Sequence, residues 1–315
     1  MRLTRPLLRL NRSFCAETLA AEVAALPASA WIPHPGNYRG NDAVPLVTPG
    51  GRISNEFVGP MMATEHLRAS PYIMEVMSAL GAVWGRGRLM GLAPGAEVPS
   101  HVDLRYYWRT HFRVHIPVIT NPEVRFHCGG ESVHMDPGEV WLFDSFRMHR
   151  VHNGGTAKRV HLVLDTVGGE GLWDLVDEAE ALDPTQAPRP VPRKQADASA
   201  LVFETVNAPR IMSPWEIRCH LAFLAEHARI HPKRDAVFRR LDKFAFAWAS
   251  VWAQHGEDDA GLPAYRALLA AVQHDLQRLS PDAIPLDNDV PLFSALGELI
   301  YQVALPPAAP VRRWA

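Results

Sequence analysis

Between residues 85 and 168, apolar and polar side chains alternate with the period of two that is typical of β-strands. In the stretch FRVHIPV, for example, apolar residues flank Arg113 and His115, so the two sets of side chains would point to opposite faces of a strand. Pairs of glycine or proline residues separate such segments and mark turns. We predict strands at Arg86–Leu92, Tyr107–Ile119, Val124–Cys128, Glu131–Met135, Glu139–Asp144 and Lys158–Asp165. Short strands at this spacing favour a double-stranded β-helix, the jelly-roll or cupin-like barrel.

On either side of these strands the pattern changes. Before residue 80, Ala16–Leu26 has a helical period, and the turn-rich remainder indicates loops and short strands. Towards the C-terminus, the sequence SPWE begins with Ser213 as an N-cap and continues with proline at the first helical position and a capping-box glutamate. Further helices are predicted after Pro232, ending near Gly256, and over Pro263–Leu279. We expect these helices to pack as a bundle.

The stretch DPTQAPRPVPRKQADASA lies between the strands and the bundle, and its prolines favour an extended linker. The sequence therefore predicts an α+β protein with a jelly-roll core and an α-helical C-terminal domain. The expected boundaries are residues 1–170 for the jelly-roll domain with its N-terminal helix and loops, 171–205 for the linker and 206–315 for the helical domain.

Composition narrows the class of protein. The chain has 315 residues and a formal net charge of −2, which argues against a nucleic-acid partner. It contains no apolar run long enough for a transmembrane helix, and its start lacks the unbroken apolar core of a signal peptide. The three cysteines, Cys15, Cys128 and Cys219, lie far apart without a CxxC pair, as expected for free thiols in a reducing cytoplasm. We therefore expect a cytoplasmic protein without a membrane partner.

His101 and Asp103 are the first candidates for chemistry. Two residues apart on an extended backbone, their side chains would point to the same side. The pair follows a predicted strand and the turn APGAEVPS at the mouth of the β-rich segment, and a metal ion held there needs a third ligand from a later strand. The sequence FDSFRMHRVHN offers His149 or His152. Two histidines and one carboxylate form the facial triad of non-haem Fe(II) oxygenases, which leaves positions open for O2 and a co-substrate.

Arg159 distinguishes the two histidines. If the co-substrate is 2-oxoglutarate, its far carboxylate needs a cation on a neighbouring strand, and the arginine fork can bind a carboxylate through two hydrogen bonds. Arg159 follows His149 by ten residues on the next predicted strand, which favours His149 as the ligand. Arg113 and His115, on the polar side of their strand, fit as partners for oxygen atoms of the co-substrate or substrate.

The segments LAPGAEVPSHVD, FRVHIPV and PGEVWLFDSFRMHRVHN, together with Arg159, resemble the aspartyl/asparaginyl β-hydroxylase family of Fe(II)/2-oxoglutarate-dependent dioxygenases over about residues 88–165. The helical part further resembles the bacterial branch that hydroxylates free L-proline. The resemblance implies that His101 and His149 bind iron, that Arg159 binds the distal carboxylate of 2-oxoglutarate, and that an Arg-x-His strand pair contacts co-substrate or substrate. It also implies O2 as co-substrate and ascorbate as an aid in vitro.

Two positions depart from the family. Asp103 supplies a carboxylate that the animal founders lack, so we expect a complete triad of His101, Asp103 and His149. Met90 stands where those founders carry a serine that helps to hold 2-oxoglutarate.

The expected activity is hydroxylation of an unactivated C–H bond of an amino acid, free, proline-like or carrier-bound, with release of succinate and CO2. One alternative is hydroxylation of Asp, Asn or another residue within a peptide or protein. Others are a cupin-like metalloenzyme that uses no O2, a barrel that only binds a small acid, and an inert barrel with satisfied polar groups. A free amino acid needs a cation for its carboxylate, for which the sequence offers Arg88, Arg105, Arg109 and Arg125.

Overall fold

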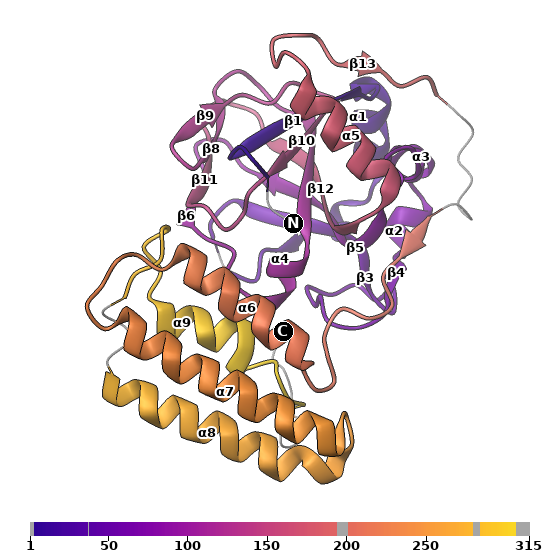
Figure 1. The fold of residues 1–315 in the computed structure, drawn as a ribbon. Coiled ribbons are helices and arrows are strands. Elements are labelled where there is room, and N and C mark those ends of the chain that lie inside the picture. Colours follow the sequence, from indigo (N-terminus) through magenta and orange to yellow (C-terminus); the bar gives the residue numbers. More distant parts are fainter. Residues whose placement is uncertain (1–2, 37, 194–200, 280–283, 307–315) are drawn as a thin grey trace. The chain divides into compact units, whose positions relative to one another are not determined.

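The computed structural model describes residues 3–36, 38–193, 201–279 and 284–306 (Figure 1). The chain divides into two compact units. The first comprises Met1–Asp103 and Thr110–Asn207, and the second comprises Leu104–Arg109 and Ala208–Trp314. The short segment Leu104–Arg109 therefore groups with the helical part of the chain, although it lies within the predicted jelly-roll sequence.

Two β-sheets form the first unit. Among the described residues, ten strands make the larger sheet, in the order β13-β1-β10-β7-β12-β5-β3-β2 with β14 on β5 and β4 on β3. Its strands are β1 (Leu7–Ser13), β2 (Ile32–Pro33), β3 (Asn41–Pro49), β4 (Met61–Ala63), β5 (Val83–Leu92), β7 (Phe112–Ile119), β10 (Glu139–Phe143), β12 (Arg159–Gly168), β13 (Arg189–Pro190) and β14 (Val202–Phe203). The smaller sheet has the order β6-β11-β8-β9, with β6 (Glu97–His101), β8 (Val124–Cys128), β9 (Glu131–Val133) and β11 (His149–Asn153).

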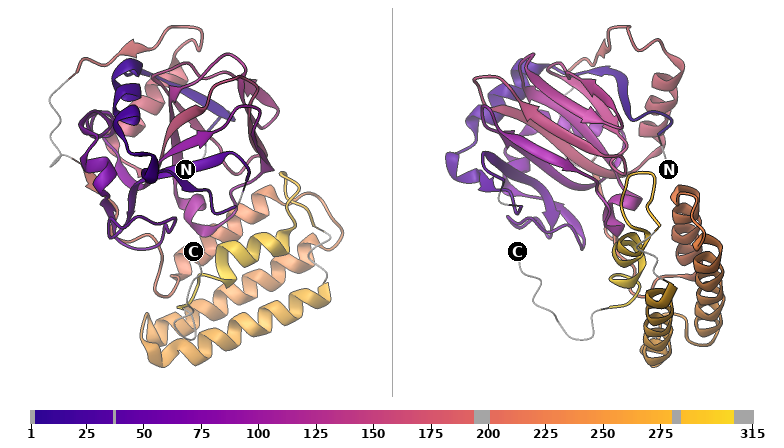
Figure 2. Two further views of the ribbon diagram at one scale, coloured as in Figure 1. Left: turned by 180° about the vertical axis from the view of Figure 1, so that it is seen from behind. Right: turned by 90° about the vertical axis from the view of Figure 1, so that its left-hand side faces the viewer.

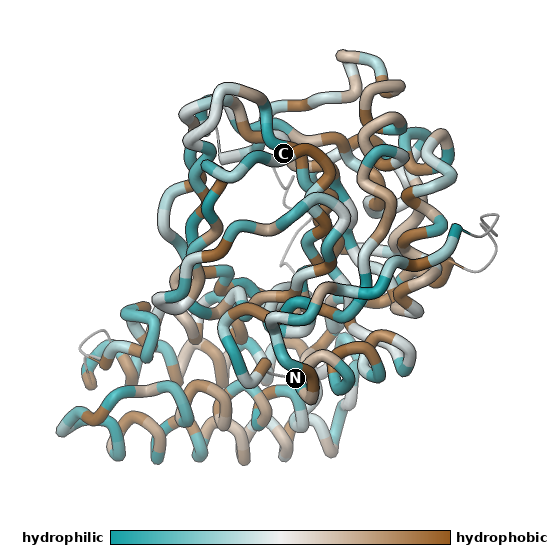
Figure 3. The backbone as a smooth tube through the Cα atoms, turned by 90° about the horizontal axis from the view of Figure 1, so that it is seen from above, coloured by the Kyte–Doolittle hydropathy of each residue, from teal (hydrophilic) through white to brown (hydrophobic). Residues whose placement is uncertain are grey.

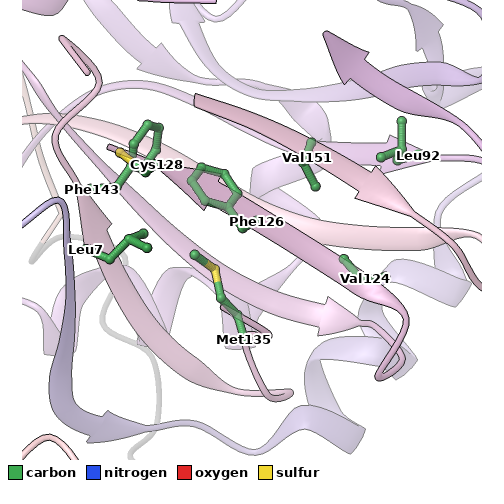
Figure 4. Packing of buried hydrophobic residues seen from close by; sticks show 8 residues of the cluster. All are labelled: Leu7, Leu92, Val124, Phe126, Cys128, Met135, Phe143 and Val151. Carbon is green, nitrogen blue, oxygen red and sulfur yellow. The ribbon is translucent and has the colours of Figure 1, made fainter. Parts of the chain in front are cut away.

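From β5 to β12 the chain passes repeatedly between the two sheets, as the right-hand view of Figure 2 helps to follow. This winding is that of a jelly roll, and it confirms the predicted fold class. Part of the space between the sheets is occupied by a cluster of hydrophobic residues to which both sheets contribute (Figure 4). Its buried members are Leu7, Leu92 and Phe143 from the larger sheet, Val124, Phe126, Cys128 and Val151 from the smaller one, and Met135 from the loop after β9.

The predicted strand Tyr107–Ile119 is wrong at its start. Residues Tyr106–Thr110 form the short helix α4, and β7 begins only at Phe112. Contacts within the second unit favour the helix: the Tyr106 hydroxyl donates to the Glu216 carboxylate at 2.7 Å, and the Arg109 guanidinium lies 3.9 Å from the centre of the Phe223 ring. Tertiary packing thus overrides the strand propensity of the aromatic residues here.

The segment expected to be a linker, 171–205, also differs from the expectation. Its start belongs to helix α5 (Glu170–Ala181), which buries Leu172, Val176 and Ala179 and packs beside β1. Strands β13 and β14 lie farther along, while residues 194–200 fall outside the described part of the chain. The prolines that follow α5 favoured a linker for the whole segment, although the apolar residues of α5 recur at helical spacing.

The remaining helices of the first unit are α1 (Ala16–Ala25), α2 (Glu65–Arg68) and α3 (Pro71–Ala79), with the 3-10 turn η1 (Ala28–Ala30). The second unit contains α6 (Pro214–His227), α7 (Arg234–His255), η3 (Asp259–Gly261), α8 (Leu262–Leu279), α9 (Leu292–Leu296) and the π-helical turn η5 (Gly297–Tyr301). Hydrophobic and hydrophilic stretches alternate along its helices (Figure 3), as expected for amphipathic helices that share a core.

The predicted start of α6 is confirmed. Ser213 accepts a hydrogen bond from the backbone N–H of Glu216, and the Glu216 side chain accepts one from the backbone N–H of Ser213. The core of the unit includes the buried Trp248, whose indole N–H donates to the carbonyl of Met212 at 2.8 Å. Within the described residues, none of the helices has the length and apolar character needed to cross a membrane.

Candidate functional site

The structure brings His101, Asp103 and His149 together, with one potential ligand atom from each within 4.8 Å of the others. His101 ends β6 and His149 begins β11, and these residues face each other in the antiparallel ladder. Asp103 is positioned by its backbone N–H, which donates to the carbonyl of Ser145 at 3.0 Å. His152 lies on the exposed side of β11, away from this cluster.

Hydrogen bonds fix the orientation of both imidazole rings. The Nδ1 atom of His101 is 2.8 Å from the carbonyl oxygen of Pro99, and that of His149 is 2.9 Å from the carbonyl oxygen of Arg147. A carbonyl oxygen only accepts, so each Nδ1 carries a proton and each Nε2 presents a lone pair when the ring is neutral. Burial is the main cause that lowers the pKa of His149 to about 4, which keeps this ring neutral near pH 7.

The Asp103 carboxylate lies between these nitrogens. Its Oδ1 is 3.9 Å from Nε2 of His101, and its Oδ2 is 3.9 Å from Nε2 of His149. Arg113 donates to Oδ2 at 2.8 Å and thereby holds the carboxylate in place. Each histidine thus has a backbone carbonyl as a hydrogen-bond partner, and the carboxylate has a donor. In protein metal sites, partners of this kind orient the ligands.

Arg113 also links the cluster to a second carboxylate. Its Nε donates to Oδ1 of Asp165 at 2.9 Å, and Arg86 Nε approaches Oδ2 of the same aspartate at 3.4 Å. Burial alone would raise the pKa of Asp165, but the charges of Arg113 and Arg86 outweigh it and leave that pKa below its usual value. Asp165 is therefore ionised and acts as the shared counter-ion of two arginines.

A second group of polar side chains lies on the same face of the larger sheet. Arg159, His115 and His161 are at most 6% exposed, and His115 and His161 have ring centroids 5.9 Å apart. Within the described residues, Nε and Nη2 of Arg159 and both ring nitrogens of each histidine have no hydrogen-bond partner. Burial lowers the pKa of Arg159 to about 9 and moves the pKa of each histidine well below its usual value.

Unpaired buried polar atoms are costly, at about 1–3 kcal/mol each, and several together indicate that something else binds them. A ligand with several oxygen acceptors would satisfy the guanidinium of Arg159 and the neutral imidazoles beside it. His161 was not among the residues predicted for the site, although its spacing of two from Arg159 predicts the same face of the strand. Met90, at the position where the family resemblance implies a serine, pairs with His161 across β5 and β12.

Two aromatic rings border this space, Phe126 from the smaller sheet and Phe143 from the larger one. Phe126 and Phe143 pack against His115, with ring centroids 5.4 and 5.1 Å away, and Phe143 also lies 4.9 Å from the ring of His149. An apolar wall of this kind excludes water and strengthens the electrostatic interactions of the groups beside it.

The four arginines considered for a substrate carboxylate belong to different parts of the structure. Arg88 is buried on the larger sheet. Arg125 is exposed on β8. Arg105 and Arg109 belong to the second unit, where Arg105 approaches Glu298 at 3.9 Å and Arg109 contacts Phe223.

Comparison with known proteins agrees with the resemblance seen in the sequence. Residues 20–168, just under half of the chain, match the family described as Aspartyl/Asparaginyl beta-hydroxylase, and the match ends where β12 ends. L-proline cis-3-hydroxylase 1 from a Streptomyces species is 26% identical over 141 residues, which are 42% of this chain and 48% of that protein. The match thus spans about half the length of this relative.

Two solved structures are similar to part of this chain at low sequence identity. One, an oxidoreductase of the 2OG-Fe(II) oxygenase family from Burkholderia pseudomallei, is 15% identical with a TM-score of 0.37, over 49% of this chain and 80% of that one. The other, a prolyl-4-hydroxylase from Pseudomonas putida, is 16% identical with a TM-score of 0.35, over 52% of this chain and 92% of that one.

Proposed function

We propose that this chain, whose residues 20–168 carry the aspartyl/asparaginyl β-hydroxylase domain, is an Fe(II)- and 2-oxoglutarate-dependent dioxygenase. Its reaction is hydroxylation of an unactivated C–H bond of an amino acid, free, proline-like or carrier-bound. The observation that carries the proposal is that His115 has the His101–Asp103–His149 cluster near it, through Phe143 and His149, and also the buried, unpaired guanidinium of Arg159. Iron with 2-oxoglutarate and O2 would supply the oxidation of the C–H bond, with release of succinate and CO2.

The cluster fits Fe(II) by the chemistry of its donors. Two neutral imidazole nitrogens and one carboxylate form the set that holds non-haem iron on one face and leaves its other positions to co-substrates. Arg113 keeps the Asp103 carboxylate oriented through Oδ2, and the carbonyls of Pro99 and Arg147 keep both Nε2 atoms directed towards the cluster. His101, Asp103 and His149 are accordingly the proposed metal ligands.

The second polar group fits 2-oxoglutarate. The distal carboxylate would accept charge-assisted hydrogen bonds from Arg159, each worth about 1.5–3 kcal/mol, and would relieve the burial of an uncompensated charge. His115 and His161 are the proposed additional donors, because their nitrogens are buried without partners. Arg113, already bonded to two carboxylates, would position Asp103 beside the co-substrate. A cupin-like metalloenzyme that uses no O2 has no need of Arg159.

Succinate release from the purified protein, supplied with Fe(II), ascorbate and 2-oxoglutarate, tests the proposal. We expect release that requires iron and rises when a pool of the twenty amino acids is added, after which splitting the pool identifies the substrate. A low rate that the pool does not change would instead favour a residue within a peptide or protein. Absence of succinate from iron-loaded protein under both conditions would refute the dioxygenase.

The place of action proposed for this enzyme is the cytoplasm. Cys15, Cys128 and Cys219 are all free thiols in the structure, a state that a reducing compartment maintains. Fractionation of cells that express the protein would test this proposal, and recovery of the activity outside the cytoplasm would contradict it.

A further inference from the structure

Arg88 is a buried cation that the proposed iron and 2-oxoglutarate sites do not use. Arg88 lies in the middle of β5, and only 6% of the residue is exposed. The other arginines nearby already have carboxylate partners. Arg113 bonds to Asp103 and Asp165, and Arg86 approaches Asp165. Within the described residues, Arg88 forms neither a hydrogen bond nor an ion pair of its own.

The strand register shows where Arg88 points. Arg88 faces Val163 across β5 and β12, and Val163 faces His115 across β12 and β7. Directly paired residues of an antiparallel ladder share one face of the sheet, and the ring of His115 packs on Phe126 of the opposite sheet. Arg88 therefore projects into the space between the two sheets, where the proposed metal ligands lie.

The site of Arg88 is distinct from that of Arg159. The partner of Arg88, Val163, is four residues along β12 from Arg159, which is about 13 Å at 3.3 Å per residue, and strand side chains stand roughly perpendicular to the sheet. The four C–C bonds of 2-oxoglutarate span at most about 6 Å at ~1.5 Å each. If the two side chains keep the spacing of their backbones, one molecule that binds Arg159 is too short to occupy Arg88 as well.

The surroundings of Arg88 favour an anion. The carboxylates near enough for their charges to act on Arg88, Asp165 and Asp103, are both bonded to Arg113, so an ammonium group finds no uncommitted partner there. His34 is near enough that the charges of Arg88 and Arg86 add to burial in lowering its pKa to about 4, so the ring is neutral. Because its Nδ1 accepts from the Gly36 N–H at 3.1 Å, its Nε2 carries the proton and is a second donor.

We propose that Arg88 binds the carboxylate of the substrate. This inference rests on the dioxygenase proposed above and narrows its substrate to organic acids whose carboxylate is free. A free amino acid meets this requirement, as does its N-acetyl derivative, whereas a carboxamide or an internal residue of a peptide backbone does not unless its side chain is acidic. In this proposal, binding of the substrate does not require recognition of its amino group.

The test measures melting temperatures of protein loaded with Mn(II) and 2-oxoglutarate, in the presence of three panels of probes: the twenty free amino acids, their N-acetyl derivatives and their carboxamides. The variants are Arg88→Gln and, as a matched control, Arg125→Gln on the exposed side of β8. We expect at least one free acid and its N-acetyl derivative to raise the melting temperature of wild type and control, while the carboxamide of the same acid does not. In Arg88→Gln the affinity for that acid should fall at least about tenfold, with the response to 2-oxoglutarate retained.

Three results would overturn the inference: equal affinity of Arg88→Gln and wild type for the acid, equal binding of acid and carboxamide, or no response to any probe although 2-oxoglutarate binds. Arg88→Met serves as a second variant if the glutamine substitution fails to fold. Failure of the proposed function has a different signature, because 2-oxoglutarate itself would then leave the melting temperature of the Mn(II)-loaded wild type unchanged.

Discussion

Replacement of Arg159 by methionine should weaken the binding of 2-oxoglutarate without lowering the free energy of unfolding. In the proposed complex, Arg159 donates charge-assisted hydrogen bonds to the distal carboxylate of 2-oxoglutarate. Loss of about 1.5–3 kcal/mol would weaken the binding of 2-oxoglutarate by ~10-fold to ~150-fold. In the free protein the same guanidinium is 4% exposed and carries unpaired nitrogens, and burial lowers its pKa to about 9. Its removal should therefore leave the free energy of unfolding unchanged or increase it.

Calorimetric titration of Mn(II)-loaded protein with 2-oxoglutarate measures the first effect, and chemical denaturation of the ligand-free protein measures the second. Arg125→Met, on the exposed side of β8, controls for loss of an arginine elsewhere in the same domain. Metal affinity should be equal in all three proteins, because none of the proposed ligands lies on β8 or β12. Unchanged binding of 2-oxoglutarate by Arg159→Met would remove Arg159 from the site. A large loss of stability would show that Arg159 is a structural residue with a partner in the folded chain.

Three further predictions concern other residues. His149→Ala should abolish iron-dependent succinate release while His152→Ala retains most of it, and the reverse result would reassign the ligand. Ser213→Ala removes the N-cap of α6 and should lower the free energy of unfolding by about 1 kcal/mol, measured by denaturant titration with Ser213→Thr as the conservative control. Burial chiefly lowers the pKa of His220 to about 4, so the unfolded chain takes up a proton between about pH 6.5 and pH 4 that the folded chain does not. Stability should therefore fall as the pH falls through this window, by up to ~1.4 kcal/mol per pH unit, and His220→Gln should reduce this slope; an equal slope in both proteins would contradict the shift.

The sequence predicted the jelly roll because most of its strands bury one apolar face, and it predicted α6 to α8 from their apolar spacing and the capping box. Strands β6 and β11 escaped detection for a physical reason. They expose most of one face and place His101 and His149 at their ends, so alternation of apolar residues is weak there. The elements that carry the proposed ligands are thus the ones that hydrophobic patterning describes least well.

The side chains that surround each candidate site residue could not be predicted from the sequence either. The sequence offered four arginines for the substrate carboxylate, and only the strand register shows that Arg88 shares a face with His115. His161 alternates with Arg159 in the sequence, but its lack of a hydrogen-bond partner is a property of the packed structure. Spacing predicts the face of a strand on which a side chain lies, whereas its partners depend on contacts between distant segments.

The charges on the inner face of the larger sheet connect the two proposals. Arg86, Arg88, Arg113 and Arg159 are accompanied there by Asp165, since the other nearby carboxylate, Asp103, belongs to the proposed metal site. A buried excess of cations is unfavourable in a barrel without ligands, because charges taken out of water need partners. A divalent metal ion adds further positive charge, and 2-oxoglutarate bound at Arg159 compensates only part of the total. The excess that remains lies around Arg88, and an anionic substrate would complete the compensation at the position where the reaction takes place.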